Sequence, residues 1–168
     1  QKAVSLTCID LSKAFDSIRH DILISKLKTL QLDNFFHNLM VSYLENRKQS
    51  VKISDIISSF KTIKSGTPQG GILSNPFFNL YINDIFNLDL SGKLSLYCDD
   101  ITLVNVGNDP MELKSNIEHD LRKIEEWLML NRLVPNADKT KYILFHNKKK
   151  FENFTGASLN IRFSGKTI

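Results

Sequence analysis

Cysteine is scarce in this sequence. Cys8 and Cys98 are the only two among 168 residues, and neither forms a CxxC or Cys/His pair. This scarcity excludes a disulfide framework and a cysteine-based zinc site, and it is typical of a reducing compartment. No apolar run is long enough to cross a membrane, and the N-terminus lacks the pattern of a secretory signal. We therefore expect an intracellular protein with no membrane partner, whose location in nucleus or cytoplasm stays open.

Glycine and proline are also sparse. The sequence holds seven glycines and four prolines, with no linker-like tract and no internal repeat, which favours a single domain over residues 1–168. The composition is that of a globular protein, with 42% hydrophobic residues and a net charge of +4. That charge is compatible with a polyanionic partner but too small to demonstrate one. Because the sequence begins inside a strand pattern without Met, we expect a fragment of a longer protein.

Hydrophobic periodicity predicts alternating strands and helices. A strand is expected over residues 3–11, with Asp10 at its end. Four helices are expected, the third with Ser74 as its N-cap: residues 22–30, Asp33 to about 46, 74–87, and 110 onward. The last helix has the clearest start, because Asp109, Pro110 and Glu112 form an N-cap, a first-turn proline and a capping box.

Further strands are expected at "SVKISD" and "SFKTIKSG", with Asp55 in their turn, and at "SLYCDDITLV" and "KYILFH". The first two alternate apolar and polar residues, as half-buried strands do. Strands in hairpins, interleaved with helices, indicate an α+β fold with an antiparallel sheet and helices packed on one face.

Two adjacent carboxylates interrupt the apolar stretch "SLYCDDITLV". Taken alone, Asp99 and Asp100 are most simply explained as a hairpin turn. The strand at 3–11 also ends in an acidic residue, however, and we expect it to lie beside strand 95–98, which would bring Asp10 next to this turn. Clustered carboxylates repel one another, and a divalent cation resolves the conflict, because Mg²⁺ prefers oxygen ligands. The soft cysteine thiols beside them suit a core role better than Mg²⁺.

Three motifs in order carry a family resemblance. "CIDLSKAFDSI", "SGTPQGGILSNPFFNLYIND" and "LYCDD", followed by "LMLNRLVPNADKTKYILF", resemble the palm motifs of reverse transcriptases, most closely those of non-long-terminal-repeat (LINE-type) retrotransposons. The resemblance covers about residues 3–147. It implies a polymerase palm fold and an RNA-directed DNA polymerase, a nucleotidyltransferase that uses two Mg²⁺ ions, with Mn²⁺ as a possible substitute. The implied partners are an RNA template, a DNA primer and a deoxynucleoside triphosphate (dNTP), and no protein partner is identified.

The resemblance also implies roles for individual residues. Asp10 and the backbone carbonyl of Leu11 match the first metal-binding position, and Asp99 and Asp100 match the catalytic pair of the YxDD box, in which Cys98 fills the variable position. Phe15 matches the steric gate that excludes the 2′-hydroxyl of a ribonucleotide. The alternative for Phe15 is a core residue.

The segment "GTPQGG" suits close contact with a ligand. Its glycines at 66, 70 and 71 allow a tight loop just before a helix N-terminus. A surface turn is the alternative, whereas the resemblance implies that Pro68, Gln69 and Gly70 touch the nucleotide and template, with Gln69 as the main contact. Lys139 matches a lysine that assists the departing pyrophosphate, although an exposed lysine without a role explains it equally well. Lys148, Lys149 and Lys150 are either nucleic-acid contacts or a solvated loop.

Parts of a complete reverse transcriptase are missing from the sequence. The fingers region that would precede Asp10 and the primer grip and thumb that would follow residue 168 are largely absent. We therefore expect a palm fragment that is inactive when isolated. The alternative function is a non-catalytic remnant or a domesticated nucleic-acid-binding module that keeps the palm fold.

Overall fold

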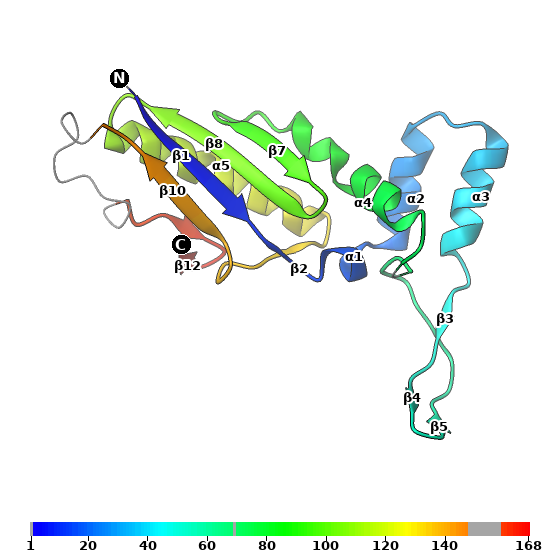
Figure 1. Cartoon of the computed structure of the whole chain (residues 1–168). Helices are drawn as coiled ribbons and strands as arrows, with labels where there is room; N and C mark the ends of the chain where they lie inside the picture. Colours follow the sequence, from blue (N-terminus) through cyan, green and yellow to red (C-terminus); the bar gives the residue numbers. More distant parts are fainter. Residues whose placement is uncertain (1, 69, 148–158) are drawn as a thin grey trace. The chain divides into compact units, whose positions relative to one another are not determined.

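Figure 1 shows a computed structural model of the chain, which describes residues 2–68, 70–147 and 159–168. The chain divides into two compact units. The first comprises residues 1–14 and 84–168, and the second comprises residues 15–83. The assignment of residues 1–168 to a single reverse transcriptase domain stays a prediction, and the two units are described separately below.

A four-stranded antiparallel sheet forms the first unit (Figure 1). Its strands are β1 (Ala3–Ile9), β7 (Lys93–Tyr97), β8 (Asp100–Gly107) and β10 (Lys141–Phe145), in the order β10-β1-β8-β7. The expectation that the first strand neighbours strand 95–98 is wrong, because β1 pairs with β8 and β10. The tight β7–β8 hairpin leaves β7 at the sheet edge and places β8 between it and β1.

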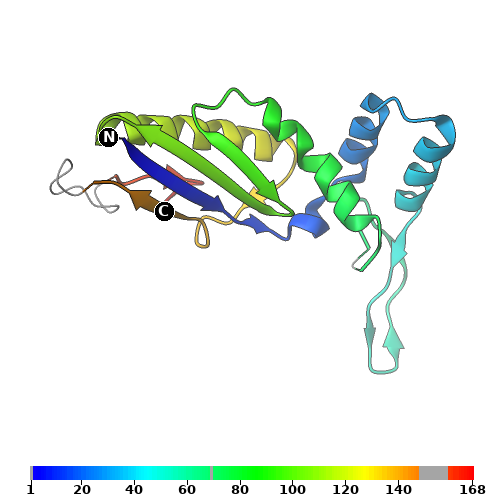
Figure 2. The same cartoon turned by 45° about the horizontal axis from the view of Figure 1, so that its top comes forward.

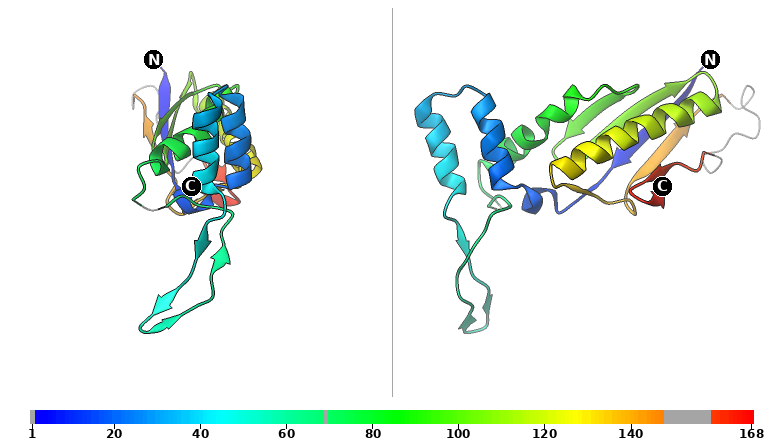
Figure 3. Two further views of the ribbon diagram at one scale, coloured as in Figure 1. Left: turned by 90° about the vertical axis from the view of Figure 1, so that its right-hand side faces the viewer. Right: turned by 180° about the vertical axis from the view of Figure 1, so that it is seen from behind.

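Helix α5 (Pro110–Leu130) covers one face of this sheet, as Figure 2 and the right panel of Figure 3 show. Burial in β1 alternates accordingly: Ala3, Ser5, Thr7 and Ile9 are buried, whereas Cys8 is exposed. The buried line of α5 consists of Leu113, Ile117, Leu121, Ile124 and Leu128. The prediction of an α+β palm-type antiparallel sheet with helices on one face is therefore confirmed.

The start and the middle of α5 are held by side-chain hydrogen bonds. Asp109 accepts a hydrogen bond from the Glu112 amide at 2.8 Å, and the Glu112 carboxylate accepts one from the Asn108 amide at 2.7 Å. The predicted N-cap and first-turn proline are thus confirmed, whereas Glu112 reaches the amide of the residue before the cap and not that of Asp109 itself. Asp120 is completely buried and accepts hydrogen bonds from the amides of Ser91 and Gly92.

Short elements complete the first unit. Strand β2 (Leu11–Ser12) pairs with β9 (Val134–Pro135), and β11 (Arg162–Phe163) pairs with β12 (Lys166–Thr167). Helix α1 (Ala14–Ser17) begins at the end of the first segment of this unit. The pairing of β2 with β9 holds the backbone directly after Asp10.

The second unit is built on three helices, α2 (His20–Thr29), α3 (Asn34–Leu44) and α4 (Ser74–Ile82). The 3₁₀ helix η1 (Asn83–Asn87) follows α4 in the chain, and its residues from 84 on belong to the first unit. Helix α2 contacts both α3 and α4. Asp33 caps α3 by accepting from the amides of Phe35 and Phe36. The expectation that Ser74 caps α4 is wrong, because its hydroxyl donates instead to the Pro68 carbonyl at 2.5 Å and Leu73 holds the N-cap position.

A two-part hairpin extends from α3 (Figures 1 and 3). Strand β3 (Lys48–Gln49) pairs with β6 (Lys61–Thr62), and β4 (Lys52–Ile53) pairs with β5 (Ile56–Ile57) around a turn at Ser54 and Asp55. The prediction of these strands and of their turn is confirmed. The prediction that the strands are half-buried is wrong, because every residue from 51 to 61 is exposed. Within the described ranges, no other helix or strand packs against the apolar side chains of this hairpin. No helix in the described part of the chain is long and apolar enough to cross a membrane.

Candidate active site

The two adjacent aspartates lie where β7 turns into β8. Tyr97 pairs with Asp100, so the turn consists of Cys98 and Asp99, one residue earlier than the sequence indicates. Cys98 has a φ of +51°, in the left-handed region that non-glycine residues seldom adopt. Backbone strain of this kind often accompanies functional turns. The turn thus presents Asp99 at its tip and Asp100 as the first residue of β8.

The register of the sheet brings Asp10 level with Asp100. Ile9 of β1 pairs with Ile101 of β8, and both isoleucines are buried. Because side chains alternate along strands, the aspartates next to them belong on the opposite face from α5. Asp10 and Asp100 line one open pocket of about 320 Å³ together with Cys8, Ile9, Ile101, Thr102 and Lys139. We call it the aspartate pocket; Asp99 is not among its lining residues.

The backbone of Asp10 is held by the segment after β9. Its carbonyl accepts a hydrogen bond from the Asn136 amide at 2.8 Å, and its amide donates to the buried Thr140 hydroxyl at 3.4 Å. Neither residue was predicted to have a role, although both lie in the segment "PNADKTKY" that contributed to the family resemblance. The same turn carries Lys139, whose Nζ lies 3.8 Å from Asp10 Oδ2.

The carboxylate of Asp10 has an unused acceptor. Its Oδ2 atom is buried and has no hydrogen-bond partner among the described residues. An oxygen of this kind suits a hard cation, and Mg²⁺ needs only one or two protein carboxylates when substrate phosphates and water complete its shell. In the same ranges, no three His, Cys, Asp or Glu side chains are grouped to hold a metal ion. The pocket therefore fits a metal held by two carboxylates and completed by substrate.

Leu11, the fourth predicted metal ligand, would contribute its carbonyl. It lies in β2, opposite Pro135 of β9. The ligand role of Leu11 stays a prediction.

Phe15 and Gly70 meet in the second unit. Both line an open pocket of about 510 Å³ with Thr67, Gly71, Ser74 and Asn75. The ring of Phe15 packs on Phe78 with centroids 4.8 Å apart, and Phe15 itself is only half-buried. This partial exposure is compatible both with a steric-gate role for Phe15 and with a packing role.

The GTPQGG loop is tightly constrained. Gly66 has a φ of +82°, and its carbonyl accepts a hydrogen bond from His20 Nε2 at 2.8 Å. A Cβ at Gly71 would lie 2.6 Å from the Tyr43 hydroxyl and 3.1 Å from the Pro68 carbonyl oxygen, so a larger residue there would have to displace these neighbours. Gln69 and Lys148–Lys150 lie outside the described residues.

Comparisons with known proteins agree with these features. The family model described as "Reverse transcriptase (RNA-dependent DNA polymerase)" matches residues 1–168. The RNA-directed DNA polymerase from mobile element jockey of Drosophila funebris is 29% identical over 146 residues, which are 83% of this chain and 16% of that protein. The probable RNA-directed DNA polymerase from transposon BS of Drosophila melanogaster is 30% identical over 139 residues, 79% of this chain and 15% of that protein. The chain thus spans about a sixth of the length of these curated relatives.

Solved structures share the fold. Telomerase from Candida tropicalis, in complex with a fragment of telomeric RNA, matches with a TM-score of 0.65 and 16% identity over 84% of this chain and 26% of that chain. Telomerase from Candida albicans matches with a TM-score of 0.64 and 19% identity over 98% of this chain and 32% of that chain. The resemblance noted in the sequence is confirmed, and the chain belongs to the reverse transcriptase (RNA-dependent DNA polymerase) family.

Proposed function

We propose that this chain is the catalytic palm segment of a retrotransposon RNA-directed DNA polymerase, which extends a DNA primer on an RNA template. The observation that carries the proposal is the aspartate pocket, where Asp10 and Asp100 face one cavity beside Lys139. Family membership and the relatives named RNA-directed DNA polymerases support it. We propose that this activity takes place inside the cell, because the RNA template and the dNTP are found there.

The carboxylates would hold the cofactor. Members of this family generally use divalent metal ions, and we propose two Mg²⁺ ions here, with Mn²⁺ as a substitute. Asp10, Asp99, Asp100 and the carbonyl of Leu11 are the proposed ligands. When bound, the metal supplies Lewis-acid activation of the primer hydroxyl and neutralises charge on the phosphates.

The reaction exchanges one phosphorus–oxygen bond for another. The primer 3′-hydroxyl gives up its proton to solvent while its oxygen attacks the α-phosphate of the dNTP, a new phosphodiester bond forms, and the bond from the α-phosphorus to the oxygen of the β-phosphate breaks to release pyrophosphate. Lys139, whose side chain is 70% exposed at the pocket edge, is proposed to donate a proton to the departing pyrophosphate. Its place next to Asp10 supports that role.

The second unit would select the nucleotide. Phe15 and Gly70 line one pocket, which supports a joint role in contacting the sugar and base of the incoming dNTP. Phe15 is proposed to exclude a 2′-hydroxyl by its bulk. Pro68 and Gln69 are proposed to complete the contact through the GTPQGG loop.

Primer extension tests this function. Labelled dNTP incorporation on a primed RNA template would be compared for the full-length polymerase that carries residues 1–168, its Asp99→Asn variant and the 168-residue chain alone. We expect robust synthesis by the first and a loss of about 10²-fold or more in Asp99→Asn, because the carboxylate provides charge stabilisation and little packing. Absence of synthesis by the unaltered full-length protein would overturn the proposal and favour a non-catalytic nucleic-acid-binding module.

A further inference from the structure

The positive charge of the chain is concentrated in one segment. Residues 47–64, which we call the basic hairpin, contain five basic residues and one acid, Asp55, and so carry a net charge of +4. The remaining 17 basic and 17 acidic residues cancel, so the hairpin accounts for the whole net charge of the chain. Its basic residues are Arg47, Lys48, Lys52, Lys61 and Lys64. Such a segment attracts polyanions.

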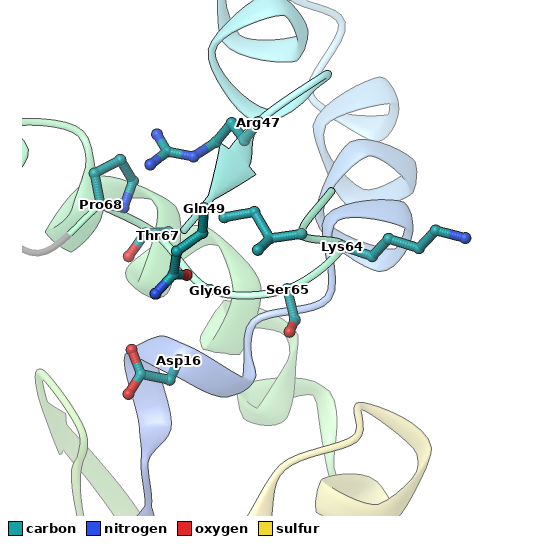
Figure 4. A pocket seen from close by; sticks show the side chains of 9 residues that line it. Asp16, Arg47, Gln49, Lys64, Ser65, Gly66, Thr67 and Pro68 are labelled. Carbon is teal, nitrogen blue, oxygen red and sulfur yellow. The ribbon is translucent and has the colours of Figure 1, made fainter. Parts of the chain in front are cut away.

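A pocket lies at the base of the basic hairpin (Figure 4). It has a volume of about 610 Å³, and its lining includes Asp16, Arg47, Gln49, Thr67 and Pro68. We call it the hairpin pocket. It is distinct from the aspartate pocket, with which it shares no residue.

Two polar groups of the hairpin pocket have no hydrogen-bond partner among the described residues. Thr67 is only 7% exposed, and its hydroxyl has no hydrogen-bond partner within the described ranges. The same holds for Arg47 Nε, a buried atom, although the Arg47 guanidinium lies 5.9 Å from the ring centroid of Tyr43. Arginine only donates hydrogen bonds, so the missing partner of Nε must be an acceptor. A buried donor without a partner is costly, and a bound acceptor removes that cost.

Asp16 sets the direction from which an anion could enter. In Figure 4 its carboxylate lies below the loop that runs through Gly66, whereas the Arg47 side chain lies above that loop and the Lys64 side chain points away from it. An anion is therefore favoured on the Arg47 side, next to Thr67, and disfavoured near Asp16.

We propose that a backbone phosphate of single-stranded RNA binds in the hairpin pocket, where Arg47 and Thr67 donate hydrogen bonds to its oxygens, and that hairpin lysines contact neighbouring phosphates. This rests on the proposed function, since it names the protein surface that holds the template strand. Phe60 is 69% exposed on the same hairpin and offers a ring on which a base can stack. An aromatic ring among lysines suits single-stranded nucleic acid better than an acidic protein.

Binding of a short fluorescein-labelled single-stranded RNA to the 168-residue chain tests the proposal by fluorescence anisotropy. Arg47→Gln should weaken binding about tenfold, because it removes a charged hydrogen bond. It should also reduce the slope of log affinity against log salt by about 0.7 between about 50 and 200 mM salt. Thr67→Val should weaken binding about threefold and leave that slope unchanged, since the hydroxyl is neutral. Arg122→Gln, the same change at an exposed residue of α5, is the control and should have no effect.

Thermal unfolding of each variant separates binding from folding. If Arg47→Gln has a clearly lower unfolding temperature than the wild type, Arg47→Lys is used in its place. This variant keeps the positive charge, so it should keep the salt slope, but it should bind RNA more weakly than the wild type. Wild-type affinity and slope in the folded Arg47 variants would overturn the proposal, as would tighter binding of poly-glutamate than of RNA. If the full-length protein makes DNA in an Asp99-dependent way but the Arg47 variants bind RNA like the wild type, only this inference is wrong.

If the Arg47 variants bind RNA more weakly but the full-length protein makes no DNA, only the proposed polymerase activity is wrong.

Discussion

Lys139 Nζ lies 3.8 Å from Asp10 Oδ2, a buried oxygen that has no hydrogen-bond partner in the described part of the chain. The lysine therefore stands where a cation is electrostatically favoured. Its side chain is 70% exposed, so solvent screens the attraction and the pair adds little to stability. At the proposed metal site, the ammonium group would compete with the metal ion for the Asp10 carboxylate.

Removing that ammonium group should strengthen metal binding. In the 168-residue chain, Lys139→Gln should raise Mn²⁺ affinity by a factor of about two to five, since two charges near 4 Å interact by about 1 kcal/mol in water. Titration followed by Mn²⁺ electron paramagnetic resonance measures this. Lys114→Gln is the matched control, because Lys114 also lies 3.8 Å from a carboxylate, that of Glu118. Equal Mn²⁺ affinity in both variants would mean that Lys139 does not face the metal site.

Asp120 should be a large contributor to stability. It is completely buried and accepts hydrogen bonds from Ser91 N and Gly92 N at 2.8 Å and from Asn105 Nδ2 at 2.6 Å. Asp120→Asn replaces an acceptor with a donor that faces other donors, so the free energy of unfolding should fall by about 2–4 kcal/mol.

Urea denaturation of the chain measures the effect of Asp120→Asn. Asp89→Asn, the same change at an exposed residue that pairs with Lys123 at 3.5 Å, should shift the free energy of unfolding by less than about 0.5 kcal/mol. If the two variants lose equal stability, the buried hydrogen bonds of Asp120 do not stabilise the fold as described.

The ion pair at the start of α2 gives a pH prediction. Arg19 donates two hydrogen bonds to Asp21, at 3.1 and 2.9 Å, which lower the pKa of Asp21 from 3.8 to about 2. Since the pKa is lower in the folded state, the contribution to stability is present above about pH 4 and is lost as the pH falls towards 2. It should be small because both side chains are exposed. Carboxyl NMR titration should show the pKa of Asp21 rising towards 3.8 in Arg19→Gln, and an unchanged value would refute the pairing.

Phe15 offers a test of nucleotide selection. Phe15→Val in the full-length polymerase should raise ribonucleotide incorporation relative to dNTP by about tenfold, because the smaller side chain leaves space for a 2′-hydroxyl. Phe15→Tyr keeps the ring and should keep the selectivity. A Phe15→Val enzyme that discriminates like the wild type would assign the ring to packing against Phe78.

Local signals in the sequence predicted the helices well. The start of α5 could be predicted because Asp109, Pro110 and Glu112 act within one turn. Ser74 failed as a cap because its hydroxyl reaches Pro68, six residues away, in a loop whose path the local sequence does not determine. The neighbour of β1 was missed for a similar reason, since strand order depends on pairing between distant segments.

Periodicity identifies an apolar face without showing what covers it. Phe36 and Leu39 of α3 are 55% and 51% exposed, and Ile53 in the hairpin is 71% exposed. At the candidate site, the acidic strand ends predicted that Asp10 lies next to the Asp99–Asp100 turn. The sheet register does place Asp10 level with Asp100, although the strand that was expected beside β1 was the wrong one. The contact of Lys139 with Asp10 was not predictable, because it depends on the turn from Asn136 to Thr140.

The central claim is that Asp10 and Asp100 act together in nucleotidyl transfer. Single-turnover primer extension by the full-length polymerase tests it with Asp10→Asn, Asp100→Asn, the double variant and Asp89→Asn as control. Each single change should slow incorporation by about 10²-fold or more, and the double variant should be no slower than the worse single one, because residues that act as a unit are not additive. Asp89→Asn should extend normally. Near-normal extension by either single variant, or losses that multiply in the double variant, would contradict a shared site.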